Sequence, residues 1–151
     1  PLEHIIAAKA VCFKEDLQPE FKEYTHQILK NTKAMERVFL DNDVRLVSGG
    51  TDNHLLLIDC RSFEMTGKEA EALLSEVNIT TNKNTIPNDP ETPFVTSGIR
   101  IGTPAITTRG LKEAEAAKVA EFMLDALKKR RPAEEIKKDV VELMKQFPIN
   151  R

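Results

Sequence analysis

The stretch "TSGIRIGTPAITTRG", residues 96–110, places an arginine between two isoleucines, and these between two glycines. Side chains alternate between the two faces of a β-strand, so a strand over residues 98–102 would turn both isoleucines toward a core and Arg100 away from it. A guanidinium presents a planar fork of donors that matches a carboxylate, and the flanking glycines would leave room for a ligand. The stretch therefore predicts a carboxylate receptor. The open alternatives are an arginine paired with an internal acid and a solvated one.

Patterns on either side of this stretch predict an α+β fold. Helical spacing of apolar residues and the end signals around it predict helices over residues 2–17, 20–40, 66–77, 111–130 and 133–146. Thr66, with Glu69 three residues later, is a capping-box signature for the start of the third helix. Alternating or continuous apolar runs predict strands over residues 45–48, 54–59 and 98–102, with a short strand over 79–81. This order predicts a small, mostly antiparallel sheet that is covered by helices and preceded by two helices.

The first predicted helix, residues 2–17, is apolar on nearly every side. Between His4 and Lys14 its only charged residue is Lys9. A helix of this kind is normally buried inside a larger body. Either it is a central helix of this domain, or its packing partner lies outside this chain.

Charge and cysteine content exclude several classes of partner. With 22 basic and 24 acidic residues the net charge is −2, which gives no reason to expect nucleic acid or an anionic membrane as a partner. The two cysteines form no CxxC motif and no cluster with histidine, so we expect no metal site. Free thiols are typical of the cytoplasm, where we expect the protein to be located.

The loop "TNKNTIPNDPETPF", residues 81–94, is rich in asparagine and proline. Amide side chains both donate and accept hydrogen bonds, so they suit a ligand with an amide-like heterocyclic edge, and prolines stiffen a loop. An ordinary turn-rich surface connection is the alternative. The residues alone thus indicate an α+β domain with one candidate anion-binding arginine and no complete catalytic constellation.

Five blocks of the sequence resemble serine hydroxymethyltransferase of the bacterial type. These blocks are "PLEHIIAAKAVCFKE", "VSGGTDNHLLLID", "MTGKEAE", "TNKNTIPNDP" and "PFVTSGIRIGTPAITTRG". They correspond only to the C-terminal portion of that family. The resemblance implies the C-terminal domain of the aspartate-aminotransferase-like fold, which is fold type I of the pyridoxal 5′-phosphate enzymes. It also implies the interconversion of serine and tetrahydrofolate with glycine and methylenetetrahydrofolate, a reaction of one-carbon metabolism and amino-acid biosynthesis.

The resemblance assigns roles to five residues. It implies that Arg100 binds the carboxylate of the amino-acid substrate, that Asn84 lies beside the folate ring, and that Thr92, Pro93 and Phe94 line the same folate site. The family's cofactor-binding lysine lies in a Thr-rich "TTTTHK" stretch that has no counterpart here. We therefore expect no catalytic, cofactor-binding or metal-binding residue in this chain, and no activity of the chain alone.

The resemblance also predicts how the chain is divided and what it binds. Residues 1–18 would form a helix that packs on a large domain absent from this chain, residues 19–40 a connecting helix, and residues 41–151 the small C-terminal domain. Partners would be the protein's own large domain, a second subunit in a homodimer, serine or glycine, and folate. Two alternatives stay open, a stand-alone regulatory domain that binds an amino acid and an interaction module built on the first helix.

Overall fold

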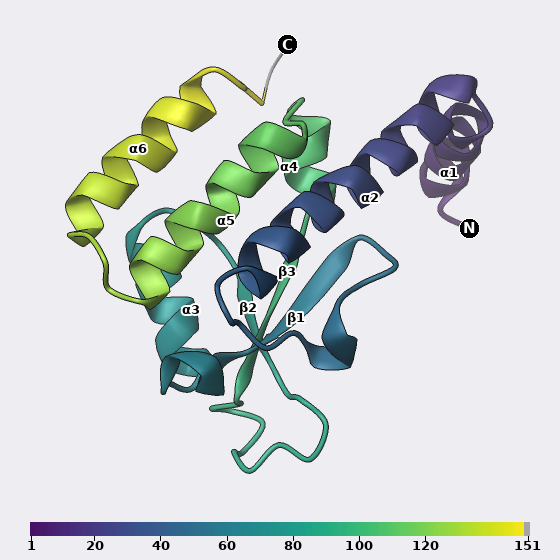
Figure 1. Ribbon diagram of the computed structural model, residues 1–151. Coiled ribbons are helices and arrows are strands. Elements are labelled where there is room, and N and C mark those ends of the chain that lie inside the picture. The colour runs from purple at the N-terminus through teal and green to yellow at the C-terminus, as the bar shows by residue number, and fades with distance from the viewer. Residues whose placement is uncertain (150–151) are drawn as a thin grey trace.

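A computed structural model describes residues 1–149 and confirms the α+β fold class. Helices cover one face of a three-stranded antiparallel sheet with the strand order β1-β3-β2 (Figure 1). The strands are β1 (Leu55–Asp59), β2 (Asn82–Asn84) and β3 (Gly98–Gly102). The helices are α1 (Glu3–Asp16), α2 (Pro19–Leu40), α3 (Gly67–Glu76), α4 (Pro104–Thr108), α5 (Glu113–Leu127) and α6 (Ala133–Lys145), with two short 3-10 helices, η1 (Val47–Gly49) and η2 (Cys60–Phe63).

The stretch that carries Arg100 forms the central strand, β3. Arg100 lies opposite Leu57 of β1 on one side and opposite Asn82 of β2 on the other. Its neighbours Ile99 and Ile101 are buried against the helices, as the alternation predicted. Because ladders of hydrogen bonds hold both edges of β3, the backbone at Arg100 is among the best fixed in the fold.

The hydrophobic core lies between the sheet and the helices α2, α3, α5 and α6. Its largest fully buried side chains include Phe39, Leu56, Ile58, Leu74, Ile99, Met123, Leu124, Leu127 and Ile136. α5 supplies three of these side chains and lies beside α2 across the sheet (Figure 1). The predicted helices over 111–130 and 133–146 are confirmed as Glu113–Leu127 and Ala133–Lys145.

A seam of buried polar side chains joins α2 to α4. The Nδ2 atom of Asn31 donates to Thr107 Oγ1 and to the carbonyl of Leu111, both at 2.9 Å. At the next residue of α2, the hydroxyl of Thr32 lies 2.7 Å from the hydroxyl of Thr103, which directly precedes α4. Buried polar groups need partners, and these hydrogen bonds therefore fix the position of α2 along α4.

The strand predicted over residues 45–48 is wrong. Leu46 makes a single bridge to Ile58, and the chain then enters η1. Ser48 and Gly49 have φ values of 67° and 73°, which turn the backbone out of an extended path. The turn removes the row of residues that a second strand would need.

The strand predicted over residues 79–81 is also misplaced, because β2 begins at Asn82. Asn78 has a φ of 62° and ends α3, and Ile79 N–H donates back to the carbonyl of Leu74 at 2.9 Å. Residues 79–81 are therefore used to leave the helix, and pairing starts only opposite Arg100. As a result Asn84 lies in a strand and not in the loop where the sequence had placed it.

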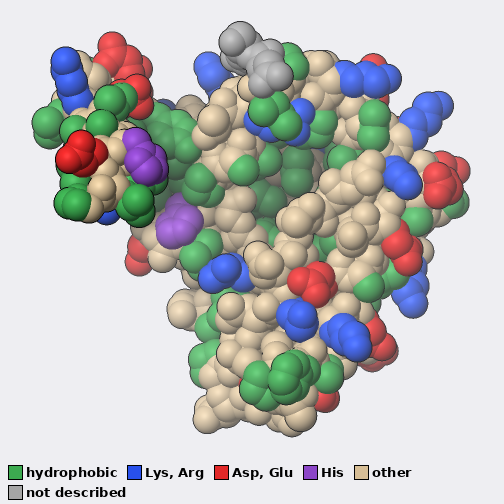
Figure 2. Space-filling model, turned by 180° about the vertical axis from the view of Figure 1, so that it is seen from behind, with side chains coloured by type: hydrophobic (Ala, Val, Ile, Leu, Met, Phe, Trp, Pro, Cys, Tyr) green, Lys and Arg blue, Asp and Glu red, His purple; other side chains and the backbone are tan. Residues whose placement is uncertain are grey.

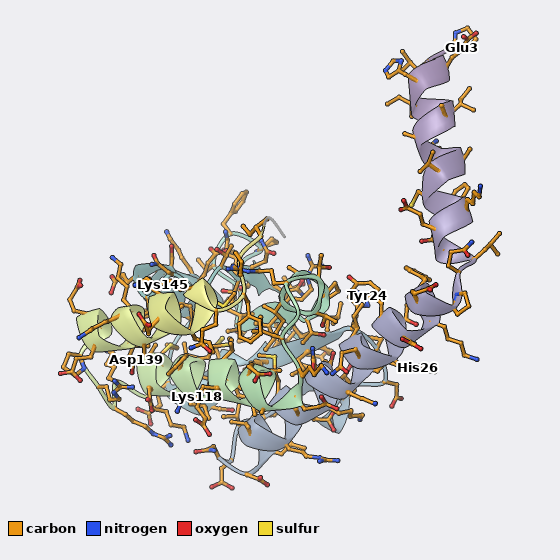
Figure 3. The ribbon with its side chains drawn as sticks, turned by 90° about the horizontal axis from the view of Figure 1, so that it is seen from above. Glu3, Tyr24, His26, Lys118, Asp139 and Lys145 are labelled. Atoms are coloured by element: carbon orange, nitrogen blue, oxygen red, sulfur yellow. The ribbon has the colours of Figure 1, made fainter. Side chains whose placement is uncertain are left out.

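Helix α1 stands apart from the rest of the molecule. It contains no buried residue, and its side chains project on all sides as it extends away from the body (Figures 1 and 3). The interpretation of α1 as a central helix of this domain is therefore wrong. Across residues 1–149, each helix is too short or too polar to cross a membrane.

Candidate functional site

Arg100 lies on the face of the sheet that the helices leave uncovered. The residue is exposed, and its guanidinium makes neither an ion pair nor a hydrogen bond with any other residue in the range 1–149. The alternative of an arginine paired with an internal acid is therefore wrong for the described residues. The remaining readings are a solvated arginine and one that receives an anion from outside the chain.

The two glycines that flank Arg100 have different surroundings. A Cβ atom on Gly98 would come within 2.7 Å of Ile86 Cγ2 and 2.8 Å of the carbonyl oxygen of Asn84, so the space above Gly98 is filled. A Cβ atom on Gly102 would meet nothing closer than 3.3 Å. The prediction that both glycines leave room for a ligand is wrong at Gly98. There, the absent side chain lets Ile86 bring the following loop onto the Arg100 face.

Asn84 shares this face with Arg100. It ends β2, two residues after the partner of Arg100 in the ladder, and residues two apart in a strand point to the same side. The residue is half-buried, and its Nδ2 atom donates to the carbonyl of Thr85 at 2.7 Å. The described residues give no donor to its Oδ1 atom, which leaves one amide oxygen to accept from a ligand.

Thr92, Pro93 and Phe94 lie in the loop between β2 and β3, which extends beyond the end of the sheet (Figure 1). The carbonyl of Thr92 accepts hydrogen bonds from the N–H groups of Val95 and Thr96, at 3.0 and 2.9 Å, which closes a tight turn. All three residues are exposed, and the aromatic side chain of Phe94 is 84% exposed.

The N-terminus of α3 contacts the C-terminal end of this loop. The predicted capping box is confirmed, since Thr66 and Glu69 cap each other's backbone N–H groups. The next two N–H groups, of Gly67 and Lys68, donate to the carbonyls of Thr96 and Val95 at 2.8 and 3.1 Å. A Cβ atom on Gly67 would overlap the Thr96 side chain and the Gly98 carbonyl, so only glycine permits this approach.

Asp89 joins the two ends of the same loop, and sequence reasoning missed it. Its carboxylate accepts hydrogen bonds from Ile86, Glu91 and Ser97. Burial alone would raise the pKa of Asp89, but the hydrogen bonds from Ser97, Glu91 and Ile86 outweigh burial and hold the pKa far below its ordinary value. The available signal was an aspartate before a proline in a turn-rich segment, which does not identify the partners.

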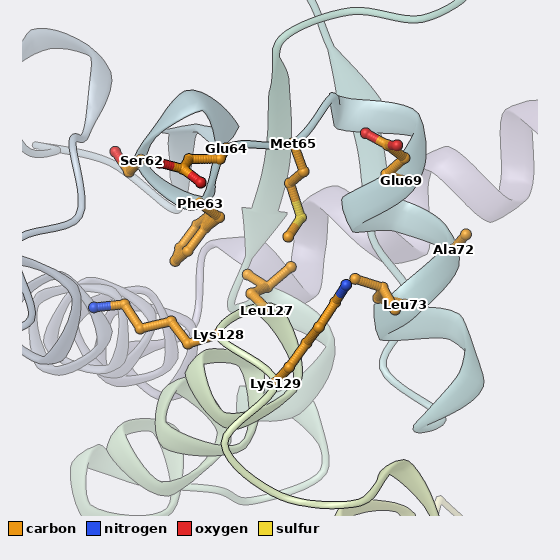
Figure 4. Close-up of a pocket in the computed structure, with 10 residues that line it drawn as sticks. All are labelled: Ser62, Phe63, Glu64, Met65, Glu69, Ala72, Leu73, Leu127, Lys128 and Lys129. Carbon is orange, nitrogen blue, oxygen red and sulfur yellow. The ribbon is translucent and has the colours of Figure 1, made fainter.

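A separate recess of about 730 Å³ lies between η2, α3 and the end of α5 (Figure 4). Met65 and Leu127 point toward each other in it, with Glu69 and Lys128 nearby (Figure 4). Two of its polar groups already have partners within the chain, because Glu69 belongs to the capping box and Lys128 Nζ donates to the carbonyl of Asn42 at 2.7 Å. No candidate residue lines this recess, and we do not assign a function to it.

The cysteines and acidic side chains do not form a second reactive centre in the described part of the chain. Burial raises the pKa of Cys60 to about 12, so this thiol stays protonated, whereas Cys12 is exposed on α1. Residues 1–149 contain no group of three His, Cys, Asp or Glu side chains that would bind a metal ion. The candidate site is therefore the uncovered sheet face with the loop beside it.

The fold and this face together define a class of protein, a small α+β domain whose antiparallel sheet carries, on its uncovered side, an arginine without a partner in the described part of the chain. A family model described as serine hydroxymethyltransferase matches residues 1–123. The match extends over most of the chain, and the chain belongs to the serine hydroxymethyltransferase family. It includes every candidate site residue and ends within α5. The bacterial type stays a prediction.

Proposed function

We propose that this chain supplies the amino-acid carboxylate receptor and part of the folate surface of a pyridoxal 5′-phosphate-dependent serine hydroxymethyltransferase. The enzyme would interconvert serine and tetrahydrofolate with glycine and methylenetetrahydrofolate. The observation that carries the proposal is the guanidinium of Arg100, which has no partner among residues 1–149 and lies on the strand that is paired on both edges. Family membership supports the reaction class.

The carboxylate side of the proposal follows from the chemistry of Arg100. An arginine has no acceptor and stays charged, so its natural partner is an anion, and a carboxylate matches its fork with two parallel hydrogen bonds. Its strand neighbours on the same face, Leu57 and Asn82, carry no charge that would compete. Because pairing on both edges fixes β3, a bound carboxylate would be held in one orientation. Correct orientation of a reacting centre contributes to catalysis.

The folate side rests on Asn84 and the loop tip. A pteridine ring has a flat apolar face and an edge of donors and acceptors. The free amide oxygen of Asn84 offers an acceptor to such an edge. The exposed aromatic ring of Phe94 and the ring of Pro93 offer apolar surface to such a face. Both residues lie in the loop between β2 and β3, whose Ile86 lies above Gly98 on the Arg100 side of the sheet.

The residues of this face do not fit the cofactor itself. Pyridoxal phosphate provides an electron sink, for which it needs a lysine that binds it covalently and an acidic partner for its ring nitrogen. Lys83, which lies next to Asn84 in β2, has its ammonium 3.6 Å from Glu71 of α3. We therefore assign the cofactor to other parts of the complete enzyme, and we derive no catalytic step from this chain beyond holding substrate and folate.

The proposal also explains the exposed helix α1. Six large hydrophobic side chains, Leu2, Ile5, Ile6, Val11, Phe13 and Leu17, are exposed in and around it. They belong to the helix that stands off from the body, where hydrophobic side chains lie between acidic, basic and histidine side chains (Figure 2). Contiguous exposed apolar surface indicates an interface. We propose that α1 packs on the large domain of the complete enzyme, which would be a cytoplasmic homodimer.

Replacement of Arg100 tests the carboxylate role in the complete enzyme. We expect Arg100→Ala to weaken serine and glycine binding by about 30-fold or more, since removal of one partner of a desolvated charge pair has a large effect. Arg100→Lys should recover part of the affinity, because it restores the charge but not the fork. Arg37→Ala, at an exposed arginine of α2, is the matched control. Serine affinity close to normal in Arg100→Ala would overturn the proposal.

A second experiment tests the assignment of the cofactor. The 151-residue chain is mixed with pyridoxal phosphate and reduced with borohydride, and the product is mapped by mass spectrometry. We expect scattered, substoichiometric labelling of exposed lysines. Stoichiometric labelling of one lysine would contradict the assignment and would favour a stand-alone function for the chain.

A further inference from the structure

The carboxylate of Asp89 joins the two ends of the loop between β2 and β3. We call this junction of Ile86, Asp89 and Ser97 the neck of the loop. Asp89 Oδ2 accepts hydrogen bonds from the N–H of Ile86, 3.1 Å away near the start of the loop, and from the N–H of Ser97, 2.9 Å away at its end. Asp89 Oδ1 accepts from the Ser97 hydroxyl at 2.6 Å and from the N–H of Glu91 at 2.9 Å. Each oxygen thus accepts two hydrogen bonds, which is the full capacity of a carboxylate.

We infer that Asp89 is a positioning residue for the folate side of the site, an inference that rests on the proposed function. The loop tip, residues 92–94, has its own turn, and its connection to the sheet passes through Asp89, through α3 and through Ser97, whose carbonyl accepts a hydrogen bond from the N–H of Cys60 at 2.8 Å. Arg100 is different, because it lies in the central strand and is fixed by pairing with both neighbours. Loss of the neck should therefore displace the folate residues and leave the carboxylate receptor in place.

The backbone at the end of the loop has an unfavourable conformation that its surroundings must stabilise. Thr96 is buried and β-branched, yet it has a φ of 58°. A residue of this type avoids that region, and it persists there only when its surroundings over-determine it. Hydrogen bonds on both sides hold Thr96 in this conformation. Ser97 donates to Asp89 on one side, and the N–H of Gly67 donates to the Thr96 carbonyl on the other.

The chemistry of the neck requires an acceptor on both oxygens. Asp89→Asn keeps the shape of the side chain but replaces one acceptor by an NH2 group. That group would face either the donors at Ile86 and Ser97 or the N–H of Glu91, and two donors repel each other. The substitution therefore opens the neck without changing the volume of the side chain.

The test compares Asp89→Asn with Glu91→Gln in the complete enzyme. Glu91 lies in the same loop, is exposed, and its side chain makes no hydrogen bond with residues 1–149, so its change removes the same charge without opening the neck. We expect Asp89→Asn to raise the Kd for tetrahydrofolate about tenfold or more and to change the Kd for serine by less than about twofold. Glu91→Gln should leave both constants unchanged. Ser97→Ala, which removes only the hydroxyl contact, should have a smaller effect on folate and remains usable if Asp89→Asn fails to fold.

Amide hydrogen exchange gives a readout that does not depend on activity. In Asp89→Asn the amides of Ile86, Glu91 and Ser97 should exchange faster, while those of β3 from Ile99 onward stay protected. Unchanged folate affinity overturns the inference, and so does a parallel loss of folate and serine affinity that follows the melting temperature. If Asn84→Ala and Phe94→Ala also leave folate affinity unchanged, the folate side of the proposed function fails as well. If those two variants lose folate and Asp89→Asn does not, only the inference is wrong.

Discussion

Two charged side chains on the same sheet show how a structural charge differs from one that is available. Asp59 at the end of β1 is buried, and it accepts hydrogen bonds from Arg61 Nε and Nη2 at 2.9 and 2.7 Å. Arg45 completes its surroundings with an ion pair at 3.3 Å. Arg100, one strand away, has no such partner among the described residues. An arginine that stabilises the fold is paired with an acidic side chain, as Arg61 is. The contrast supports a ligand-binding role for Arg100.

The paired aspartate predicts a pH dependence of stability. Hydrogen bonding from Arg61 lowers the pKa of Asp59, and burial opposes this only in part. A lowered pKa in the folded state means that the stabilisation is complete above the unfolded-state pKa of about 3.9 and is lost as the pH falls through the folded-state pKa. We expect Asp59→Asn to reduce the free energy of unfolding by about 1–3 kcal/mol at neutral pH. In urea titrations this difference should shrink as the pH falls below the unfolded-state pKa of about 3.9, and a constant difference would contradict the assignment.

Gly67 predicts a steric effect at the start of α3. Gly67→Ala would force a methyl group into the Thr96 side chain and the Gly98 backbone, and overpacking of this kind costs about 1–3 kcal/mol. Gly49→Ala is the comparison, because a Cβ atom there meets nothing within 4 Å and only the positive φ is unfavourable. Urea denaturation should show the larger loss at Gly67. Equal losses of stability would mean that the close contact between the loop and Gly67 does not restrict the side chain at this position.

At the scale of elements, the sequence predicted what local patterns determine. The capping box predicted the start of α3, and apolar spacing with proline boundaries predicted α2 and α6, because these signals lie within a few residues of the element. β2 was misplaced because its three residues are polar, and only their pairing with β3 makes them a strand. The buried face of α2 also includes the polar residues Asn31 and Thr32, which apolar spacing does not identify.

The buried hydrogen bonds of Asn31 predict a large loss of stability when its side chain is removed. Asn31 is fully buried, and its amide also accepts from Gln27 Nε2 at 2.9 Å. Asn31→Ala leaves Thr107 and the Leu111 carbonyl without their donor, and buried groups left unsatisfied cost about 1–3 kcal/mol. Thermal or urea unfolding would measure the loss, with the exposed Asn82→Ala as a control. A loss within about 0.5 kcal/mol would show that water replaces the amide without penalty.

At the scale of the whole molecule, the candidate site was only partly readable from the sequence. The alternation around Arg100 predicted its exposed position, because a strand's two faces follow from local order. The contacts of Asp89 with Ser97 and of Gly67 with Thr96 were not predictable, because they join segments that become neighbours only in the folded chain. The roles of Asn84 and of residues 92–94 came from resemblance alone, and they stay predictions.

The molecule consists of a folded body and a helix that contributes nothing to its core, and this division can be tested. Because Ile6 and Phe13 on α1 are 61% and 63% exposed, changing both to glutamine should alter the free energy of unfolding by less than about 0.5 kcal/mol. The same change should reduce binding of a hydrophobic dye and self-association in sedimentation, since it removes exposed apolar surface. Leu74→Ala in the core is the contrast, with an expected loss of about 2–5 kcal/mol. If the α1 variant loses as much stability as Leu74→Ala, α1 packs on the body of its own chain, and the interface proposed for the complete enzyme is wrong.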